Sequence, residues 1–173
     1  MTTIATARLI LRPHVPADAG ALLRGLGNFN VSRWTARVPY PYALADADTF
    51  LRLPDEGAVR RAIALKETPS ELIGGIGYEW KADALPEIGY WLAEGFWGRG
   101  YAAEATRAMM DHAFDVTGHQ SMVASYQIGN EASRRILEGL GFAEVGQGTS
   151  FSLAQNADTR IMWLRLDGQG RRP

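Results

Sequence analysis

The sequence predicts an α/β protein with a central mixed, mostly antiparallel sheet of about seven strands flanked by helices. Three observations predict this class. Short apolar strand-like segments and longer segments with helical spacing share one chain of 173 residues. Three of the strand-like segments are joined by short turns, which favours an antiparallel meander. The later segments alternate strand and helix, so the same sheet also needs crossover connections.

The N-terminal third begins with a short apolar strand over residues 8 to 13, closed by Pro13. A helix over residues 16 to 27 follows. Residues 28 to 57 hold aromatic side chains among prolines and small polar residues, so we expect short helices joined by loops. The strands of the meander then cover residues 59 to 66, 71 to 80 and 86 to 92.

The second half alternates helices and strands. Residues 100 to 117 carry small and apolar side chains at helical spacing, and Gly118 is suited to end that helix. A strand over residues 121 to 128, a helix over 130 to 141 and two closing strands within 142 to 151 and 158 to 166 complete the pattern.

Composition limits the classes of function. The length fits one domain, expected over residues 1 to 167 with a disordered tail over 168 to 173. A formal charge of -1 provides no global field for nucleic acid or an anionic membrane, so neither is an expected partner. The absence of cysteine excludes disulfides, thiolate metal sites and a cysteine nucleophile. Without a signal peptide or an apolar run of about 18 residues, we expect a cytoplasmic protein.

The segment "EGFWGRGYAAEA", residues 94 to 105, is the first candidate site. A strand ending near Leu92 runs through glycines into a helix, and the start of a helix leaves several main-chain N–H groups without partners. Such donors suit a phosphate, and glycine lets the anion approach the chain closely. Arg99, between Gly98 and Gly100, adds a positive charge.

Two alternatives apply to these glycines. They also fit a loose dinucleotide fingerprint, but the acidic residue expected about 20 positions later is missing. The other alternative is that they only allow tight packing of the strand against the helix. His14, His112 and His119 show no metal-ligand spacing, and we expect no metal. Glu104, Arg107 and Asp111 are spaced for ion pairs on the helix surface.

Four segments in one order resemble the GNAT superfamily of N-acetyltransferases, in the branch that includes the RimJ and RimL ribosomal-protein N-terminal acetyltransferases. They are "ATARLILRP" (5 to 13), "EIGYWL" (87 to 92), "WGRGYAAEA" (97 to 105) and "NEASRRILEGLGF" (130 to 142). The resemblance covers almost the whole chain. It implies a splayed sheet with acetyl-CoA bound between the strands predicted over 86 to 92 and 121 to 128.

The resemblance also implies the acetyl-CoA contacts. The diphosphate loop of the family matches Trp97, Gly98, Arg99, Gly100, Tyr101, Ala102 and Ala103, with main-chain amides holding the phosphates. Trp97 stands where the wider superfamily usually has glutamine or arginine. The preceding strand is expected to offer main-chain groups of Tyr90, Trp91 and Leu92 to the pantetheine arm. Asn130 matches a CoA-binding asparagine or serves as a helix N-cap, and Ser133 and Arg135 complete the set.

Glu87 is the preferred general base, because an amine must lose a proton before it attacks a thioester. Deprotonation at pH 7 costs about 1 kcal/mol for an α-amine and about 4.6 kcal/mol for lysine. Strand alternation places Glu87, Gly89 and Trp91 on one face, and Gly75, Gly77 and Glu79 on one face of the preceding strand. Where these faces meet, the glycines are expected to leave space for a substrate.

The remaining steps need two further groups. A strand amide at Trp91 or Leu92 is expected to stabilise the oxyanion. Many superfamily members protonate the departing thiolate with a tyrosine, but Leu137 occupies that position. Ser133 is the replacement, with Tyr126 behind it, although a thiolate of pKa about 8.5 has little need of an acid.

The acceptor is the least determined part of the site. Trp34, Tyr40 and Tyr42 either line the acceptor pocket or anchor the core, and Glu79 is a second acidic candidate beside the substrate. The resemblance implies a primary amine acceptor, such as a protein N-terminus or a small-molecule amine, and a homodimer. The alternative function is a catalytically weak domain that binds or senses acyl-CoA.

Overall fold

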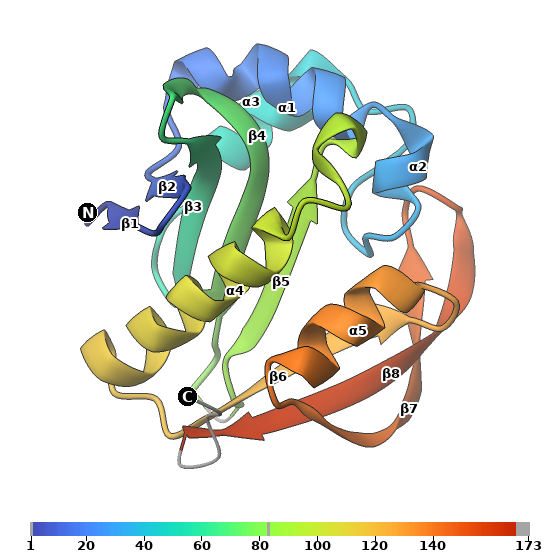
Figure 1. Ribbon diagram of the computed structural model, residues 1–173. Coiled ribbons are helices and arrows are strands. Elements are labelled where there is room, and N and C mark those ends of the chain that lie inside the picture. Colours follow the sequence, from blue (N-terminus) through green and yellow to red (C-terminus); the bar gives the residue numbers. More distant parts are fainter. Residues whose placement is uncertain (1, 83, 169–173) are drawn as a thin grey trace.

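The computed structural model describes residues 2–82 and 84–168 and contains one open sheet of eight strands in the order β1-β2-β3-β4-β5-β6-β8-β7 (Figure 1). The strands are β1 (Ile4–Ala5), β2 (Leu9–Arg12), β3 (Ala58–Leu65), β4 (Thr68–Glu79), β5 (Glu87–Leu92), β6 (Ser121–Gln127), β7 (Ala143–Ser152) and β8 (Ala157–Asp167). All neighbouring pairs are antiparallel except β5 and β6, which are parallel.

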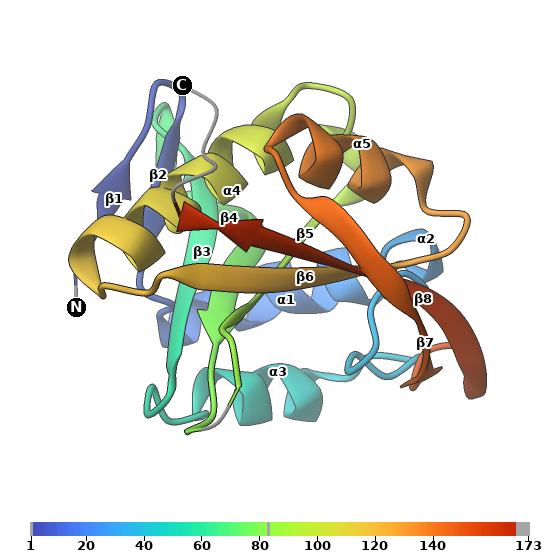
Figure 2. The same ribbon diagram turned by 90° about the horizontal axis from the view of Figure 1, so that it is seen from below.

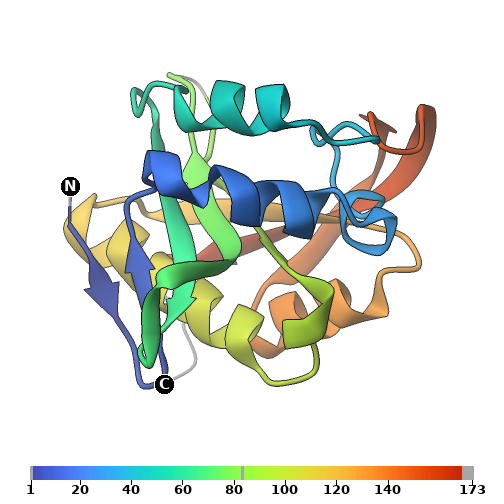
Figure 3. The ribbon, with the colours of Figure 1, turned by 90° about the horizontal axis from the view of Figure 1, so that it is seen from above.

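Helices cover both faces of the sheet. They are α1 (Ala19–Leu26), α2 (Phe29–Ser32), α3 (Leu44–Leu51), α4 (Tyr101–Asp111) and α5 (Glu131–Gly139), with short 3-10 helices η1 (Pro16–Asp18) and η2 (Glu94–Phe96) and a π-helical segment η3 (His112–Val116) that continues α4. Figures 2 and 3 show α1 and α3 on one face and α4 and α5 on the other. The sheet is therefore buried between two helical layers in its central part.

The predicted α/β class is confirmed, with one correction to the number of strands. The meander of β3, β4 and β5 is present, and the segment 28 to 57 holds the two short helices α2 and α3. The eighth strand is β1, where Ile4 pairs with Leu11 and Ala5 with Ile10. Two residues have too little periodicity to indicate a strand, so only pairing with β2 defines it.

The parallel pair of β5 and β6 separates after two residue pairs. Glu87 is opposite Val123 and Ile88 is opposite Ala124, and the strands then diverge, as Figure 1 shows. We call residues 89–92 of β5 and 125–127 of β6 the fork. The divergence leaves one edge of β5 without a strand partner in the middle of the sheet.

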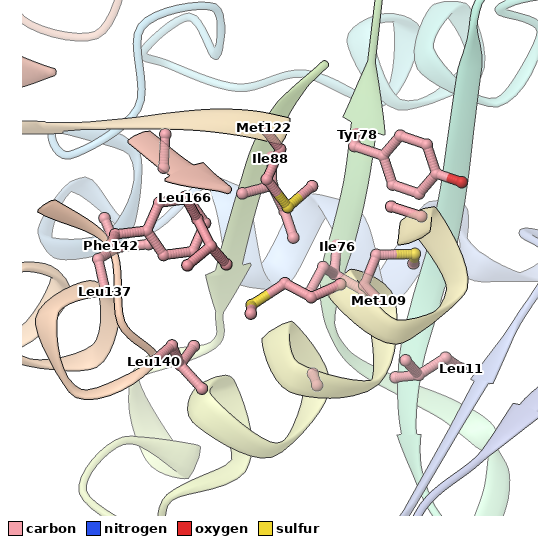
Figure 4. Close-up of a cluster of buried hydrophobic side chains, with 14 of the residues drawn as sticks. Leu11, Ile76, Tyr78, Ile88, Met109, Met122, Leu137, Leu140, Phe142 and Leu166 are labelled. Atoms are coloured by element: carbon pink, nitrogen blue, oxygen red, sulfur yellow. The ribbon is translucent and has the colours of Figure 1, made fainter. Parts of the chain in front are cut away.

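Two apolar clusters hold the layers together. The larger lies between the sheet and the helices α4 and α5, and Figure 4 shows Met109, Met122 and Leu137 within it. The smaller lies under α1 and α3, around Leu22 and Ala47. Because α4 and α5 are anchored in the same cluster, their N-terminal ends are both fixed near the fork.

Asp18 is a buried charge that ties the start of α1 to β2. Its carboxylate is 2% exposed and accepts hydrogen bonds from Arg12 at 2.7 and 2.9 Å and from the Val15 N–H at 2.9 Å. Burial alone would raise the pKa of Asp18, but the hydrogen bonds from Arg12 and the Val15 N–H, with His14 Nδ1 nearby at 3.7 Å, outweigh it and lower the pKa well below its ordinary value.

We expect Asp18→Asn to reduce the free energy of unfolding at pH 7 by about 2 kcal/mol, because the charged hydrogen bonds to Arg12 are lost. The native state binds this proton less tightly than the unfolded chain, so the stabilisation is present above the ordinary aspartate pKa and is lost as pH falls below it. Urea unfolding at pH 7 and at about pH 2.5, which lies below the ordinary aspartate pKa of about 3.9, should therefore show a smaller difference between variant and parent at the lower pH. The exposed Asp158→Asn is the control, and an equal difference at both pH values would contradict the assignment.

The C-terminal end of the fold lies close to β6. The Gly168 N–H donates to the Gln120 carbonyl at 2.8 Å, so this residue is part of the fold. The rest of the predicted tail, 169 to 173, lies outside the described residues. No helix in the described chain is both long and apolar enough to cross a membrane.

Candidate active site

The unpaired edge of β5 is the centre of the candidate site. The Ala93 N–H donates to the Ile73 carbonyl in β4, whereas the Pro86 carbonyl accepts from the Val123 N–H in β6. Main-chain groups alternate in direction along a strand. Tyr90 and Leu92 therefore direct their N–H groups into the fork, where a ligand can replace the missing strand.

Trp91 differs from its predicted role. It is paired with Gly75, and its main-chain groups point toward β4. The expectation that the Trp91 amide faces the pantetheine or the oxyanion is therefore wrong, and Leu92 and Tyr90 are the amides that face the fork. Sequence alternation gave the side-chain faces correctly but could not say which residues bond to β4.

The side chain of Trp91 fills part of the space predicted for a substrate. A β-carbon at Gly25 or at Gly75 would lie 2.6 Å from the indole ring, so both glycines are needed to admit it. By contrast, a β-carbon at Gly89 would meet nothing within 4 Å. The open space on this face of the sheet lies over Gly89, between Trp91 and Glu87.

The diphosphate loop, residues 97–103, contains two left-handed residues. Gly98 has φ 72° and Gly100, which precedes the first residue of α4, has φ 79°. Within residues 2–82 and 84–168, no acceptor takes a hydrogen bond from the main-chain amides of residues 98 to 103. A β-carbon at Gly98 would lie in open space, so its conformation, not tight packing, requires glycine.

The indole of Trp97 connects the diphosphate loop to β5. Its Nε1 donates to the Leu92 carbonyl at 2.8 Å, which ties the loop to the end of β5. This contact occupies one of the Leu92 main-chain groups that were expected to face the pantetheine. The Leu92 N–H remains directed into the fork.

The N-terminus of α5 forms the other side of the fork. Asn130 caps this helix, because its side-chain oxygen accepts the Ser133 N–H at 3.2 Å. The Ser133 hydroxyl lies 3.0 Å from the Tyr90 hydroxyl, so this pair bridges from α5 to β5. Burial raises the pKa of Tyr90 to about 12, with only partial compensation from Ser133, and the phenol is neutral. Tyr126 instead donates to Glu144 at 2.9 Å and is directed toward β7.

Glu87 and Glu79 face each other across β4 and β5, as predicted. Glu87 is half-buried and accepts a hydrogen bond from the Ser125 hydroxyl at 3.1 Å. Glu79 forms an ion pair with Arg37 at 2.6 Å and lies 3.9 Å from Arg60. The charge of Glu79 is compensated by arginine, whereas Glu87 has a hydroxyl partner beside the fork.

The aromatic residues of segment 28 to 57 separate into different environments. Tyr42 is 8% exposed and belongs to the smaller core cluster, which supports an anchoring role. Tyr40 is 46% exposed and its ring lies 5.0 Å from that of Phe29. Trp34 is half-buried under the Arg33 guanidinium. The loop after α2 is tied to the β7–β8 turn by the Leu153 N–H to Ala36 carbonyl bond of 2.9 Å.

A groove of about 750 Å³ lies between α4, α5 and residues 5 to 7, next to the diphosphate loop. Arg135 lines it together with Ala103. Arg134 instead bonds Glu131 and Glu138 along α5. Of these two neighbouring arginines, Arg135 is therefore the one placed beside the loop.

Glu104, one of three residues spaced for ion pairs on the surface of α4, has partners outside its own helix. Its carboxylate bonds Arg8 at 2.7 Å and the Thr6 hydroxyl at 2.6 Å, almost one hundred positions away in sequence. Sequence reasoning missed Thr6 and Arg8 as neighbours of the diphosphate loop. No local spacing could have indicated them, since the contact exists only because β2 lies beside α4.

Two other positions agree with their sequence assignments. Leu137 is fully buried in the larger core, so the superfamily tyrosine position holds no polar group in this chain. His112 lies 2.9 Å from the Tyr78 hydroxyl, which makes it a structural histidine. The described residues contain no group of three or more His, Cys, Asp or Glu side chains suited to a metal ion.

Comparison with known proteins identifies the family. The model of the acetyltransferase (GNAT) domain matches residues 8–143. The uncharacterised N-acetyltransferase p20 of Bacillus licheniformis is 30% identical over 152 residues, which cover 84% of this chain and 85% of the relative.

Solved structures show the same fold. RimJ of Mycobacterium smegmatis, in complex with a CoA disulfide, has a TM-score of 0.82 at 21% identity over 97% of this chain and 88% of its own. A RimL ribosomal α-N-protein acetyltransferase in complex with coenzyme A also has a TM-score of 0.82, at 18% identity over 96% and 98%. The fork, the left-handed glycines and these similarities show that the chain belongs to the GNAT family of acetyltransferases.

Proposed function

We propose that this chain transfers the acetyl group of acetyl-CoA to a primary amine by direct attack in a ternary complex. One observation carries the proposal. The unpaired N–H groups of Tyr90 and Leu92 and the free amides of the diphosphate loop border the same opening in the sheet. A pantetheine arm can pair with β5 while its diphosphate meets the start of α4.

Several predicted contacts support this placement of acetyl-CoA. Residues 98 to 103 supply the amides, and Arg135 lies beside them in the groove along α4. Asn130 fixes the first turn of α5 through its cap, which leaves its side-chain amide nitrogen available to the ligand. Arg99 adds a positive charge on the exposed side of the loop.

Glu87 is the proposed general base. Its carboxylate borders the open space over Gly89, where an amine can reach both the carboxylate and a thioester in the fork. The amine transfers its proton to Glu87, directly or through water, as it attacks the thioester carbon. The Leu92 or Tyr90 N–H then stabilises the oxyanion.

The departing thiolate receives a proton from Ser133 in this proposal. Because Ser133 and the neutral Tyr90 are within hydrogen-bond distance, Tyr90 can replace the donated proton. Leu137 offers no competing acid.

We expect Ser133→Ala to lower kcat by about tenfold, less than typical acid-base effects, because a thiolate is a good leaving group. Tyr90→Phe keeps the Ser133 hydroxyl and should lower kcat less. Steady-state rates at saturating acetyl-CoA measure both effects. An unchanged kcat in Ser133→Ala would remove this residue from the mechanism.

The acceptor is proposed to be a protein N-terminal α-amine, including that of a ribosomal protein, or a small-molecule amine. The RimJ and RimL names of two structural neighbours support the first. Chemistry agrees, because an α-amine is deprotonated at low cost and needs only a carboxylate as base. Of the three aromatic residues predicted for the acceptor side, Trp34 and Tyr40 remain accessible, whereas Tyr42 is buried.

Calorimetry with acetyl-CoA tests the proposal before an acceptor is known. We expect saturable binding of acetyl-CoA and none of NAD. Release of CoA should then be measured with short peptides that carry free N-termini and with small amines. Binding without turnover on any amine would favour the acyl-CoA sensor, and no binding would reject both functions.

A further inference from the structure

Arg8, in the turn before β2, contacts both the diphosphate loop and the first turn of α4 (Glu104). Its Nη1 donates to the Arg99 carbonyl at 2.9 Å. Its Nε donates to Glu104 at 2.7 Å. Its guanidinium also lies 4.7 Å from the centre of the Tyr101 ring. One side chain therefore touches the loop, the first residue of α4 and the first turn of that helix.

Glu104 is held by the same turn from a second side. One carboxylate oxygen accepts the Thr6 hydroxyl at 2.6 Å and the Arg8 N–H at 2.8 Å. Burial would raise the pKa of Glu104, but these bonds and Arg8 outweigh it and lower the pKa. The carboxylate is ionised and has a fixed position in the first turn of α4.

This position of a carboxylate is unfavourable for an anion at the same helix end. A negative side chain in the first turn stabilises a helix, but it repels a diphosphate bound to the same N–H groups. Arg8 compensates the charge of Glu104 at a distance of 2.7 Å. The repulsion is thereby reduced without the loss of the side chain that anchors α4 to β2.

The backbone of the diphosphate loop must also be held in one conformation for tight binding. Gly98 and Gly100 can adopt many conformations, and fixing them costs entropy when a ligand binds. The Arg8 contact to the Arg99 carbonyl holds the residue between these two glycines. The loop is therefore ordered before the ligand arrives.

We propose that Arg8 is a positioning residue for acetyl-CoA, which orders the diphosphate loop and neutralises Glu104. The inference rests on the proposed function and adds a residue from a distant, N-terminal part of the sequence. Arg8 acts through the loop and on the diphosphate part of the ligand only. Acetyl-pantetheine has the same thioester but no diphosphate, so it separates this role from a general structural one.

Arg8→Gln should raise KM for acetyl-CoA by about tenfold, which corresponds to about 1.4 kcal/mol of binding free energy. The kcat should stay nearly unchanged. KM for acetyl-pantetheine should stay within about twofold of the parent, since that substrate makes no use of the loop. Arg165→Gln is the matched control, because Arg165 is similarly exposed and is paired with Asp167 at 2.9 Å on β8. An acetyl-CoA KM within about twofold of the parent, or an equal rise for both thioesters, would overturn the proposal.

The double variant tests the charge argument. In Arg8→Gln with Glu104→Gln the repulsion is gone, so KM for acetyl-CoA should recover by about threefold or more. No recovery would overturn the neutralising role. Circular dichroism verifies folding, and Arg8→Lys replaces Arg8→Gln where the latter does not fold. Lysine keeps the charge beside Glu104 but has one nitrogen in place of the guanidinium fork that also reaches the Arg99 carbonyl, so a smaller rise in KM, still selective for acetyl-CoA, is expected. A parent protein that binds no acetyl-CoA would reject the proposed function itself, which is a different outcome.

Discussion

Glu87→Gln is expected to lower kcat for acetyl transfer to an α-amine by about 100- to 1000-fold, in the range of general-base effects. Glutamine keeps the size of the side chain and can still accept the Ser125 hydroxyl, which lies 3.1 Å from Glu87. It cannot take the proton of the attacking amine. The loss should therefore appear in kcat, with KM for acetyl-CoA nearly unchanged.

The pH dependence distinguishes a base from a structural carboxylate. Above a pH of about 8 an α-amine is deprotonated in solution, so the difference between variant and parent should narrow as pH rises through that range. Rates at pH 6.5 and pH 9 measure it. Glu71→Gln, an exposed carboxylate near the other end of β4, is the control, and a pH-independent defect in Glu87→Gln would argue against proton transfer.

Gly100→Val is expected to weaken acetyl-CoA binding by about 100-fold, which corresponds to about 2.7 kcal/mol. Gly100 has φ 79°, a conformation that a β-branched residue adopts only under strain. A β-carbon here would also lie 3.3 Å from Arg8 Nη2. To relieve the backbone strain and the close contact with Arg8, the loop must change its conformation. We expect this change to turn the loop amides away from the phosphates.

Two glycine variants separate strain from steric contact. Gly98→Ala has φ strain but open space around its β-carbon, so it should weaken binding by about tenfold. Gly95→Ala is the control and should leave binding unchanged. Gly95 lies just before the loop, has no positive φ and has no neighbour within 4 Å of its β-carbon position, so the variant has neither backbone strain nor a steric contact. Calorimetric Kd values for acetyl-CoA rank the three, and an affinity unchanged in Gly100→Val would remove the loop from the binding site.

Much of the fold follows from local patterns. The meander of β3 to β5 and the helix after the glycines were predictable, because side-chain period and turn residues depend on near neighbours in sequence. The same holds for the face shared by Glu87 and Glu79, since alternation along a strand is a local property. The sequence indicated that Gly98 and Gly100 form a loop before a helix, but not that both residues have a left-handed backbone conformation.

Other features depend on pairing between distant segments. β1 exists only because Ile4 and Ala5 meet β2. The direction of the Trp91 amide depends on which residues bond to β4, and a sequence period cannot give this. The space over Gly75 is filled by a Trp91 indole that also needs Gly25 of α1.

The sequence by itself determined the class of fold, the position of a glycine-rich loop at the start of a helix and the strand face that carries Glu87. The tertiary structure alone decided which strand amides face the fork, that Glu79 is paired with arginine and that Arg8 reaches Glu104. The physical reason is the distance along the sequence over which each kind of interaction acts. Periodicity and backbone preference act over a few residues, whereas strand register and ion pairs between segments are fixed only when the whole core packs.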